Sequence, residues 1–244
     1  MTLKTVVVIP TYNEVENLPR IVQEILGQDV PGLGVLVVDD GSPDGTGEVA
    51  DKLAETHPGV IDVLHRTTKD GLGRAYRAGM SKAIADGADL VVQMDADFSH
   101  PPTALLPMIE AARRGAGLVI GSRYTPGGSL DEAWGLHRRL LSRWANFYVK
   151  TILGVPAADV TAGFNLWSKG ALESIDLERV ESSGYSFQVE MKYLASRAGV
   201  RIAEVPIRFA QRVAGTSKMS IGVQLESAWM PWRLRAKHQG GVQA

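Results

Sequence analysis

The chain has 244 residues, enough to bury a core as one domain, or as one domain with an extension. Its apolar content of 45% and charged content of 22% are ordinary for a globular protein. The absence of cysteine excludes disulfides and thiolate metal sites. No apolar run approaches the roughly 18 residues that span a bilayer, and residues 5–10 predict a first strand rather than a signal peptide.

The net charge of −1 conceals an asymmetry along the chain. Residues 1–110 carry 8 Lys+Arg against 17 Asp+Glu, a net charge of −9, whereas residues 111–244 carry 18 against 10, a net charge of +8. The acidic half suits a metal-binding site, and the basic half suits phosphates or an anionic membrane surface. Chance segregation of exposed charges explains the same counts.

Strands and helices alternate through the first half of the chain. β-branched apolar runs predict strands, and apolar residues at helical spacing predict the helices between them. Repeated strand–helix units indicate a parallel sheet with right-handed crossovers. In chain order we expect a strand over 5–10, a helix over 18–26 with Asn17 as its N-cap, a strand over 34–39, a helix over 46–56, a strand over 60–65, a helix over 74–85 closed by Gly87, a strand over 90–94, a helix over 101–114 and a strand over 117–121.

The second half is less regular. Residues 125–131 are rich in Gly and Pro and predict a loop, and residues 138–153 predict a helix. Strands are expected over 164–168 and 202–209, and a flexible loop over 213–219. No internal repeat or low-complexity linker interrupts the chain, which favours a single domain.

The most informative stretch is residues 91–98, an apolar run that ends in Asp95 and Asp97 with only Ala96 between them. The run has the length of a buried parallel strand, and open α/β sheets bind ligands at the carboxyl ends of their strands. Two carboxylates there suit a hard divalent cation that keeps positions open for phosphate oxygens. The pattern predicts a metal holding a nucleotide diphosphate, although Asp pairs also occur in turns and helix caps.

Polar residues also follow the first two strands. Asp39 and Asp40 are placed to accept hydrogen bonds from a base or ribose, or to form an Asx turn into residues 43–45, with one Asp for each role if both hold. Tyr12 is placed to stack on a base and Glu14 to accept hydrogen bonds. A plain turn explains these last two residues equally well.

Basic candidates come later in the chain: Arg123, the pair Arg138 and Arg139, Arg212 and Lys218. Arginine binds phosphate through two parallel hydrogen bonds, and lysine binds it as a point charge. Each of these residues alone is explained by a solvated surface charge. Arg123 is the strongest candidate, because it lies just past a predicted strand end on the same edge as the Asp pair.

An amphipathic segment over residues 221–234 lies near the C-terminus and is followed by Arg235 and Lys237. Its Trp229 and Trp232, together with the basic end, suit a membrane interface. A core-packing helix with a basic cap explains the pattern equally well.

Other chemistries lack sequence support. The chain has no Gly-x-x-x-x-Gly-Lys-Ser/Thr phosphate loop and no Gly-x-Ser-x-Gly elbow, and its five histidines lack metal-ligand spacing. Gly71 and Gly73 lack the third glycine of a dinucleotide fingerprint and indicate a tight loop entering a helix. Basic residues are not interleaved with aromatic ones, so no nucleic-acid groove is expected.

Taken together, the ordered motifs resemble one family. A first set of motifs consists of VVVIPTYNE (6–14), VVDDGSPDGT (37–46), GLGRAYRAG (71–79) and MDADFSHPP (94–102), and these resemble family-2 inverting glycosyltransferases. The resemblance covers roughly residues 5–235 and implies an α/β chain with the GT-A glycosyltransferase fold, a Rossmann-like, mostly parallel sheet flanked by helices. GSRY (121–124), RRLLSRWAN (138–146), DVTAGF (159–164), GYSFQVEM (184–191) and RVAGTSKM (212–219) narrow the resemblance to dolichol- or polyprenol-phosphate mannose synthases.

The resemblance implies transfer of mannose from GDP-mannose to the phosphate of a polyprenol carrier. Carried over by position, it implies a guanosine site at Pro10, Tyr12, Glu14, Val38 and Asp40. It implies that Asp95, Ala96 and Asp97 contact the sugar, the diphosphate and a Mg²⁺ or Mn²⁺ ion, and that Arg123, Arg138 or Arg139, Arg212 and Lys218 bind donor and acceptor phosphates. Some relatives have Gln as a further metal ligand where this chain has Ser99, so water is expected to complete the coordination.

The expected chemistry follows from charge. A phosphate monoester has a second pKa near 6 and is largely dianionic at neutral pH, so it is already a nucleophile. A strong general base is not required, and Asp95, Asp97 and Arg123 form the expected catalytic set, acting by position and electrostatics.

The resemblance also implies a membrane-bound acceptor. We expect a catalytic domain over 5–220 and a membrane-proximal segment over 221–244, with the protein on the cytoplasmic face of a membrane. The C-terminal segment docks there, or a separate membrane-anchoring protein recruits the enzyme. The rival readings are a related transferase that uses UDP-glucose, a nucleotidyltransferase, and a non-catalytic nucleotide-sugar-binding protein.

Overall fold

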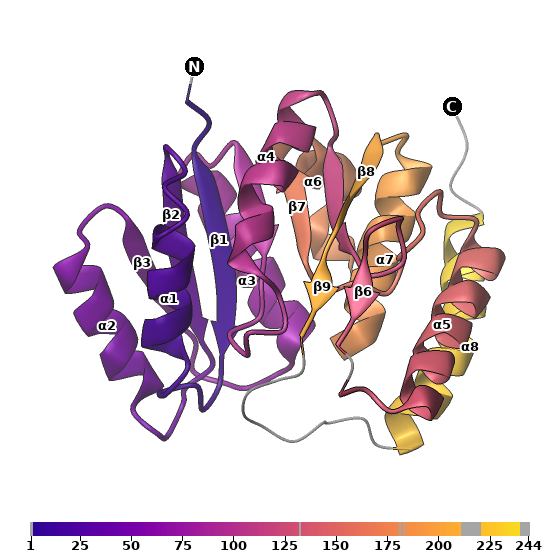
Figure 1. Ribbon diagram of the computed structural model, residues 1–244, viewed down its shortest axis with the longest axis horizontal. Coiled ribbons are helices and arrows are strands. Elements are labelled where there is room, and N and C mark those ends of the chain that lie inside the picture. The colour runs from indigo at the N-terminus through magenta and orange to yellow at the C-terminus, as the bar shows by residue number, and fades with distance from the viewer. Residues whose placement is uncertain (1, 132, 181, 183, 211–220, 240–244) are drawn as a thin grey trace.

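A seven-stranded sheet with the order β3-β2-β1-β4-β7-β5-β8 lies at the centre of the protein (Figure 1). The computed structural model describes residues 2–131, 133–180, 182, 184–210 and 221–239. A second sheet pairs β6 with β9. The strands are β1 (Thr5–Thr11), β2 (Leu33–Asp39), β3 (Ile61–His65), β4 (Leu90–Gln93), β5 (Leu118–Ser122), β6 (Ser129–Leu130), β7 (Asn165–Ser168), β8 (Ile202–Pro206) and β9 (Arg208–Phe209).

Helices cover both faces of the large sheet, so the chain forms three layers (Figure 1). The α-helices are α1 (Leu18–Leu26), α2 (Thr46–Thr56), α3 (Leu72–Ala85), α4 (Leu105–Arg113), α5 (Leu136–Leu153), α6 (Lys169–Ile175), α7 (Gly184–Arg197) and α8 (Ile221–Gln239). Two short 3-10 helices, η1 (Pro102–Ala104) and η2 (Leu177–Arg179), complete the described elements.

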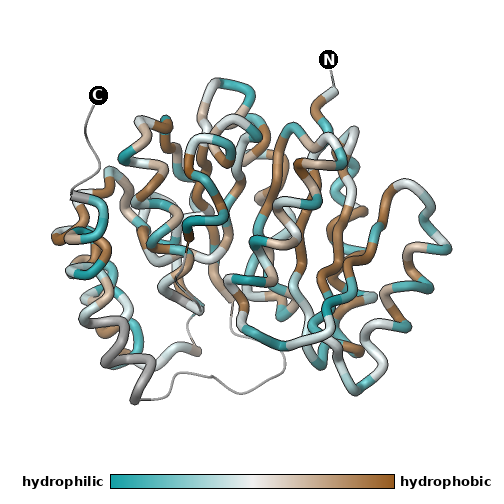
Figure 2. Tube along the Cα trace, turned by 180° about the vertical axis from the view of Figure 1, so that it is seen from behind, coloured by the Kyte–Doolittle hydropathy of each residue, from teal (hydrophilic) through white to brown (hydrophobic). Residues whose placement is uncertain are grey.

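The central strands are buried on both sides, because successive side chains of a strand point to opposite faces. Val8 and Val38 belong to the apolar cluster that contains residues of α3 and α7. Val7 and Val37 belong to the cluster that contains residues of α1 and α4. Figure 2 shows the result as strongly apolar strands enclosed by more polar helices.

The packing of α3 on the sheet requires a glycine. A Cβ atom at Gly79 would lie 2.4 Å from Val8 Cγ1 and 2.8 Å from Val38 Cγ2. The helix backbone therefore rests directly on β1 and β2, which fixes the position of the loop that leads into α3. That loop was expected from Gly71 and Gly73, and α3 begins at Leu72.

The first-half elements predicted from sequence are confirmed, with most boundaries shifted by only one or two residues. The expected mostly parallel sheet is confirmed, and its exception is β7, which pairs antiparallel with β4 and β5. Strand direction depends on the path of the preceding chain, which hydrophobic periodicity does not report. The remaining strand pairs of the large sheet are parallel.

Three local predictions need correction, and two helices were missed. The loop over 125–131 contains strand β6, and the strand over 202–209 is divided into β8 and β9. Helices α6 and α7 were not predicted. Asn17 does not cap α1 with its side chain; the Asn17 amide instead donates to Glu14 Oε2 at 2.8 Å. The loop expected over 213–219 lies outside the described residues.

Helix α8 packs beside α5 at the end of the sheet opposite α2 (Figure 1). Met230 and Leu234 are buried in the core, whereas Trp229 and Trp232 are exposed. The described part of this segment therefore has a core-packing face and an exposed aromatic face. Within the described parts of the chain, no helix has both the length and the apolarity to cross a membrane.

Candidate active site

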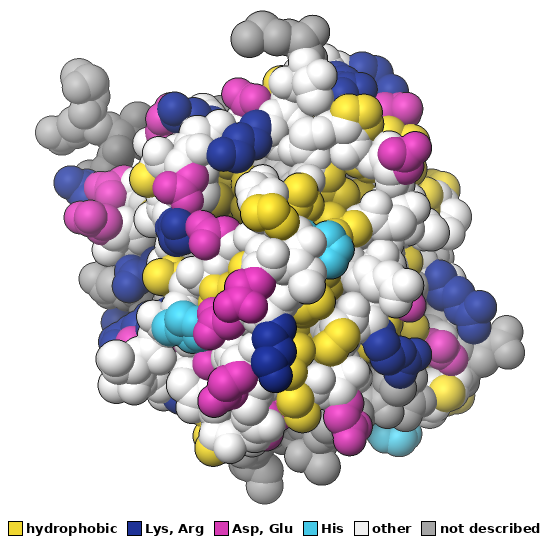
Figure 3. Space-filling model, turned by 90° about the vertical axis from the view of Figure 1, so that its left-hand side faces the viewer, with side chains coloured by type: hydrophobic (Ala, Val, Ile, Leu, Met, Phe, Trp, Pro, Cys, Tyr) yellow, Lys and Arg dark blue, Asp and Glu magenta, His cyan; other side chains and the backbone are white. Residues whose placement is uncertain are grey.

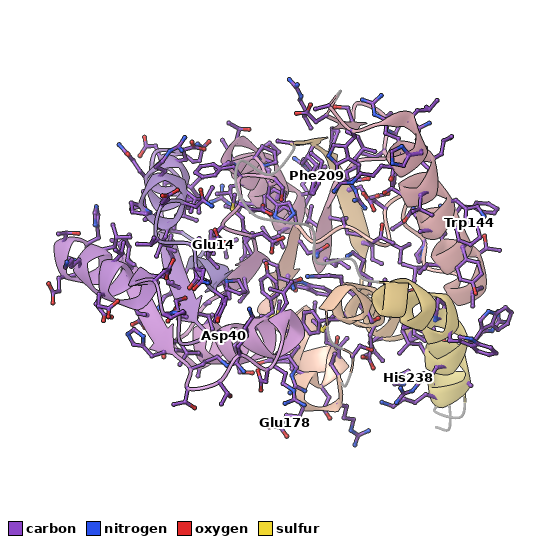
Figure 4. All side chains as sticks on the ribbon, turned by 90° about the horizontal axis from the view of Figure 1, so that it is seen from below. Glu14, Asp40, Trp144, Glu178, Phe209 and His238 are labelled. Carbon is purple, nitrogen blue, oxygen red and sulfur yellow. The ribbon has the colours of Figure 1, made fainter. Side chains whose placement is uncertain are left out.

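The carboxyl ends of β1, β2 and β4 meet at one edge of the large sheet. In the parallel register Thr11 pairs with Asp39, and Val8 pairs with Gln93. Figure 4, which views the molecule from below, shows Glu14 and Asp40 on the same side of the molecule, among the N-terminal elements. The segments that follow these strands therefore share one edge, as the sequence predicted.

Asp95 and Asp97 lie in the turn that follows β4. The Tyr76 hydroxyl donates a hydrogen bond of 2.7 Å to Asp95 Oδ1, and the Ser99 amide donates one of 3.0 Å to Asp97 Oδ1. Tyr76 is fully buried, and burial together with the neighbouring Asp95 raises its pKa well above the ordinary value of 10.0. It therefore remains a neutral donor that orients the Asp95 carboxylate. Asp97 is buried and Asp95 is half-buried.

Asp39 and Asp40 divide the two roles considered for them. Asp39 builds the turn, because it accepts hydrogen bonds from the Ser42 amide at 3.1 Å and the Ser42 hydroxyl at 2.5 Å. Asp40 forms an ion pair of 2.6 Å with Arg66. Burial raises the pKa of Asp40, and the attraction of Arg66 offsets this only in part. Asp40 thus lies in a buried ion pair with Arg66, whereas Asp39 holds the turn.

The other predicted guanosine residues surround this point. The Lys69 ammonium lies 3.3 Å from the centre of the Tyr12 ring, a cation–π contact on the face proposed for a base. Glu14 is half-buried and accepts the Asn17 amide, and Pro10 is half-buried at the end of β1. The Val38 side chain is buried in the core, so this residue offers its backbone rather than its side chain to a ligand.

Arg123 is locked in place at the end of β5. Its Nε and Nη2 atoms each lie 2.7 Å from an oxygen of Asp159, and Nη2 also donates to the Thr161 hydroxyl at 2.7 Å. Asp159 is fully buried, which alone would raise its pKa, but the charge and hydrogen bonds of Arg123 lower the pKa overall. The guanidinium is therefore a fixed cation in a charge-assisted pair.

The remaining basic candidates differ in their surroundings. Arg138 is exposed, and its guanidinium carbon lies 3.7 Å from the centre of the Trp134 ring. Arg139 is turned inward, and its Nη2 donates to the Leu130 carbonyl at 3.3 Å and the Asp131 carbonyl at 2.9 Å. Of the pair, Arg138 is therefore better placed to meet a phosphate. Arg212 and Lys218 lie outside the described residues.

A cavity of about 300 Å³ lies beside Arg123. Tyr124, Gly128, Arg143 and Asn146 complete its lining. Arg143 was missed by the sequence reasoning, although it lies one turn beyond Arg139 in the same predicted helix. The cavity combines two arginines with a tyrosine and an amide, which is a lining suited to a small anion.

A buried charge network lies next to this cavity. The Lys192 side chain is fully buried, and its Nζ donates to the Ala162 carbonyl at 2.6 Å. Burial lowers the pKa of Lys192 to about 7, although Asp159 and Glu204 oppose the shift. Glu204 accepts hydrogen bonds from the amides of Ala158 and Asp159. These contacts hold the segment that carries Asp159, and through it Arg123.

The acidic turn fits a shared metal site rather than an all-protein one. Among the residues that the structure describes, no group of three or more His, Asp or Glu side chains is arranged to hold an ion. Two carboxylates at a strand end leave open positions, which a diphosphate and water fill in sites for hard divalent cations. Ser99 is fully buried and its amide holds Asp97, so it serves the turn.

The sequence model of the family described as Glycosyl transferase family 2 matches residues 6–176. The chain belongs to glycosyl transferase family 2. This glycosyltransferase is 48% identical over 219 residues to a polyprenol monophosphomannose synthase from Mycolicibacterium smegmatis, which covers 90% of this chain and 82% of the relative. It is 46% identical over 240 residues to an undecaprenyl-phosphate mannosyltransferase from Micrococcus luteus, covering 98% of this chain and 97% of the relative.

Solved structures agree on the fold of this glycosyltransferase. Mannosyl-3-phosphoglycerate synthase from Rubrobacter xylanophilus superposes with a TM-score of 0.66 at 20% identity, covering 99% of this chain and 76% of the other. Glucosyl-3-phosphoglycerate synthase from Mycobacterium tuberculosis, in complex with Mn²⁺, UDP-glucose and phosphoglyceric acid, gives 0.64 at 18% identity, covering 99% and 82%. The expected GT-A fold, with a mostly parallel sheet flanked by helices, is confirmed.

Proposed function

We propose that this glycosyltransferase moves mannose from GDP-mannose to the phosphate of a polyprenol, with inversion at the anomeric carbon. The observation that carries the proposal is the 46–48% identity to two proteins named as synthases or transferases of polyprenyl-phosphate mannose, over at least 90% of this chain. The residues at the ends of β1, β2 and β4 and the arginines of the cavity beside Arg123 support it.

The donor side of the proposal rests on the edge formed by β1, β2 and β4. Asp40, beside Arg66, accepts hydrogen bonds from the guanine base or the ribose, and Tyr12 stacks on the base once Lys69 has shifted. Pro10, Glu14 and Val38 line the same pocket for guanosine.

Asp95, Ala96 and Asp97 meet the diphosphate and sugar, and the two carboxylates hold a Mg²⁺ or Mn²⁺ ion. When bound, this ion supplies charge neutralisation for the departing GDP.

The acceptor side rests on the cavity beside Arg123. Arg123 and Arg143 line about 300 Å³ of space, which suits the phosphate end of the acceptor. Arg138 adds a third guanidinium near the start of α5, and Arg139, Arg212 and Lys218 remain proposed phosphate ligands. Because Arg123 is already held by Asp159, it meets the phosphate without reorganisation, which favours electrostatic catalysis.

The proposed chemistry needs position and charge more than proton transfer. The acceptor phosphate is largely dianionic above its second pKa near 6, so one of its oxygens attacks the anomeric carbon while the bond to GDP breaks. Arg123 and Arg138 reduce the repulsion between the two anions, and Asp95 and Asp97 hold the donor in line. No residue must remove a proton from the nucleophile.

A lipid acceptor fits the exposed apolar face shared by α5 and α8. We call this surface the apolar face, and its seven residues are each more than half exposed. They are Leu136, Leu140, Leu141, Trp144 and Phe147 on α5, and Trp229 and Trp232 on α8. Figure 4 shows Trp144 at the outer side of α5, pointing away from the sheet.

The distribution of charge also favours the apolar face as the side that meets a membrane. Residues of α5 together with residues 229–238 of α8 include seven Lys and Arg and no Asp or Glu. The opposite flank, formed around α2 and β3, carries acidic as well as basic side chains (Figure 3). Tryptophan and basic residues suit the interface of a membrane with anionic lipids. We place the apolar face on the cytoplasmic surface of a membrane, by itself or with a separate anchoring protein.

Replacing Asp97 by Ala tests the catalytic proposal. Turnover of labelled GDP-mannose should be lost while the circular dichroism spectrum and melting temperature stay close to those of the parent, because only a metal and donor ligand is removed. Asp86→Ala, at a half-exposed carboxylate paired with Lys82, is the control and should keep its activity. Near-normal activity of the Asp97 variant with metal present would show that this site assignment is wrong.

Replacing Leu140 by Ser tests the membrane proposal. Leu140 lies on the apolar face at 57% exposure, and Leu106 on α4 is a matched leucine at 45% exposure away from that face. Sedimentation with vesicles containing phosphatidylglycerol should fall for Leu140→Ser, by up to about tenfold for a side chain that becomes buried, and remain unchanged for Leu106→Ser. Equal sedimentation of the two variants would contradict this placement. Deleting α8 is a poorer test, because Met230 and Leu234 belong to the core.

A further inference from the structure

His100 closes the turn that carries the two acidic residues, and its ring is only 2% exposed. The amide of Asp95 donates a hydrogen bond of 3.1 Å to His100 Nδ1. An acceptor at Nδ1 carries no proton there, so the neutral ring has its proton on Nε2. His100 Nδ1 thus accepts from the backbone of Asp95, and Tyr76 donates to its carboxylate.

The ring of His100 is held by aromatic neighbours on two sides. It stacks on Phe164 with ring centres 5.1 Å apart and planes inclined by 14°. Phe209 meets it edge-on at 5.6 Å. Phe164 is itself confined, because a Cβ atom at Gly121 would lie 2.7 Å from Phe164 Cδ1. The Nδ1 atom of His100, which accepts the hydrogen bond from the Asp95 amide, therefore has little freedom to move.

The rest of the turn is held by contacts of its own residues. Phe98 adopts a left-handed backbone conformation with φ of 62°, which is unfavourable for a bulky side chain and persists only where neighbouring contacts impose it. Its neighbours are fixed, since the Ser99 amide is bonded to Asp97 and the Ser99 carbonyl accepts the Ala210 amide at 3.2 Å. Together with Tyr76 on the carboxylate, His100 leaves Asp95 held at two points.

We propose that His100 is a positioning residue of the donor site, which fixes the backbone of Asp95 so that its carboxylate meets the metal and diphosphate without reorganisation. The inference rests on the proposed metal-binding role of Asp95. Groups that hold metal ligands typically change affinity by about 10- to 100-fold when they are replaced. His100 also touches Phe209, whose ring centre lies 5.4 Å from the Arg123 guanidinium carbon, so Phe209 connects His100 with the Arg123 side of the proposed site.

Two substitutions separate the hydrogen bond from the packing. His100→Phe keeps an aromatic ring against Phe164 and removes the acceptor, whereas His100→Asn keeps an acceptor near the position of Nδ1 and removes the ring. Calorimetric titration with GDP, in Mn²⁺ and again in EDTA, measures how far the metal strengthens nucleotide binding. Hydrogen exchange of the peptide that contains Asp95, in the protein without ligand, reports the turn directly.

We expect His100→Phe to lose about 10- to 100-fold of GDP affinity in Mn²⁺ and little in EDTA, with faster exchange at the Asp95 amide. His100→Asn should keep most of the Mn²⁺-dependent affinity even though it melts at a lower temperature. Parent-like binding by His100→Phe, or losses in both variants that simply follow their melting temperatures, would overturn the positioning role.

Nucleotide binding to the parent protein, measured with and without Mn²⁺, distinguishes a failure of this inference from a failure of the proposed function. If Mn²⁺ strengthens neither GDP nor UDP binding to the parent, the metal role of Asp95 fails, and the positioning role fails with it. If Mn²⁺ strengthens binding to the parent and to His100→Phe equally, only the positioning role fails.

Discussion

Replacing Asp159 by Asn should destabilise the fold strongly, because it removes the carboxylate that pairs with the buried guanidinium of Arg123. Arg123 is 10% exposed and loses its charged partner, while the asparagine still offers one oxygen to it. Removing one member of a buried ion pair typically costs about 3–5 kcal/mol, and the retained oxygen places this variant near 3 kcal/mol. That is a large share of the total stability of about 5–15 kcal/mol that is usual for a domain.

Urea unfolding at pH 7 measures this cost as a lower midpoint at an unchanged slope. Asp86→Asn, at a 48% exposed carboxylate, is the control and should change stability by less than about 0.5 kcal/mol. The pKa of Asp159 is lowered in the fold, so its contribution is present above the ordinary value of 3.8 and is lost as pH falls through the folded pKa. The difference between parent and variant should therefore shrink in acid. A loss below about 1 kcal/mol at pH 7 would refute the view of Arg123 as a cation held by Asp159.

Three further predictions concern buried groups near the site. The pKa of Lys192 is lowered from 10.5 to about 7, so the unfolded chain holds the extra proton between these values and stability should rise with pH across that window. Lys192→Met should flatten this rise, which has a limit of about 1.4 kcal/mol per pH unit, in melting curves from pH 7 to 10; an unchanged slope would contradict the burial of a neutral amine. Tyr76→Phe removes the hydroxyl that donates to Asp95 and should weaken GDP binding in Mn²⁺ by about 3- to 10-fold, as measured by calorimetry. Unchanged binding would show that Tyr76 does not need to orient Asp95. Gly79→Ala should lower the free energy of unfolding by about 1–3 kcal/mol, because its Cβ meets two valines, whereas Gly170→Ala, in open space, should not; equal urea midpoints would contradict the close contact of α3 with the sheet.

The edge formed by the carboxyl ends of β1, β2 and β4 was largely predictable from sequence. Apolar β-branched runs that end in Asp39 and Asp95 placed both carboxylates at strand ends, and parallel pairing brought these ends together. This inference needs only local periodicity and the general geometry of parallel sheets. It did not need the direction of β7, which hydrophobic periodicity does not report.

The partners of the site residues were not predictable in the same way. Asp159 lies 36 residues from Arg123, and no spacing rule connects them. His100 and Tyr76 stood inside recognised motifs without an assigned role, because their contacts with Asp95 depend on how the turn and α3 are placed. Such pairings are set by tertiary packing.

The apolar face shows a third case. A helix over residues 138–153 was expected, and Trp144 and Phe147 were visible within it. An amphipathic pattern identifies an apolar stripe but not which stripe meets the core. In the structure Val149 and Ile152 of α5 pack inward, and the stripe with Trp144 and Phe147 stays exposed.

The most direct test of the account is a transfer assay with the purified protein. Labelled GDP-mannose and, in parallel, labelled UDP-glucose are incubated with a polyprenyl phosphate and Mg²⁺ or Mn²⁺, and label entering the organic phase is counted. We expect transfer from GDP-mannose only, and none after removal of the metal with EDTA. Transfer from UDP-glucose instead, or no transfer from either donor even after native membranes are added, would contradict it.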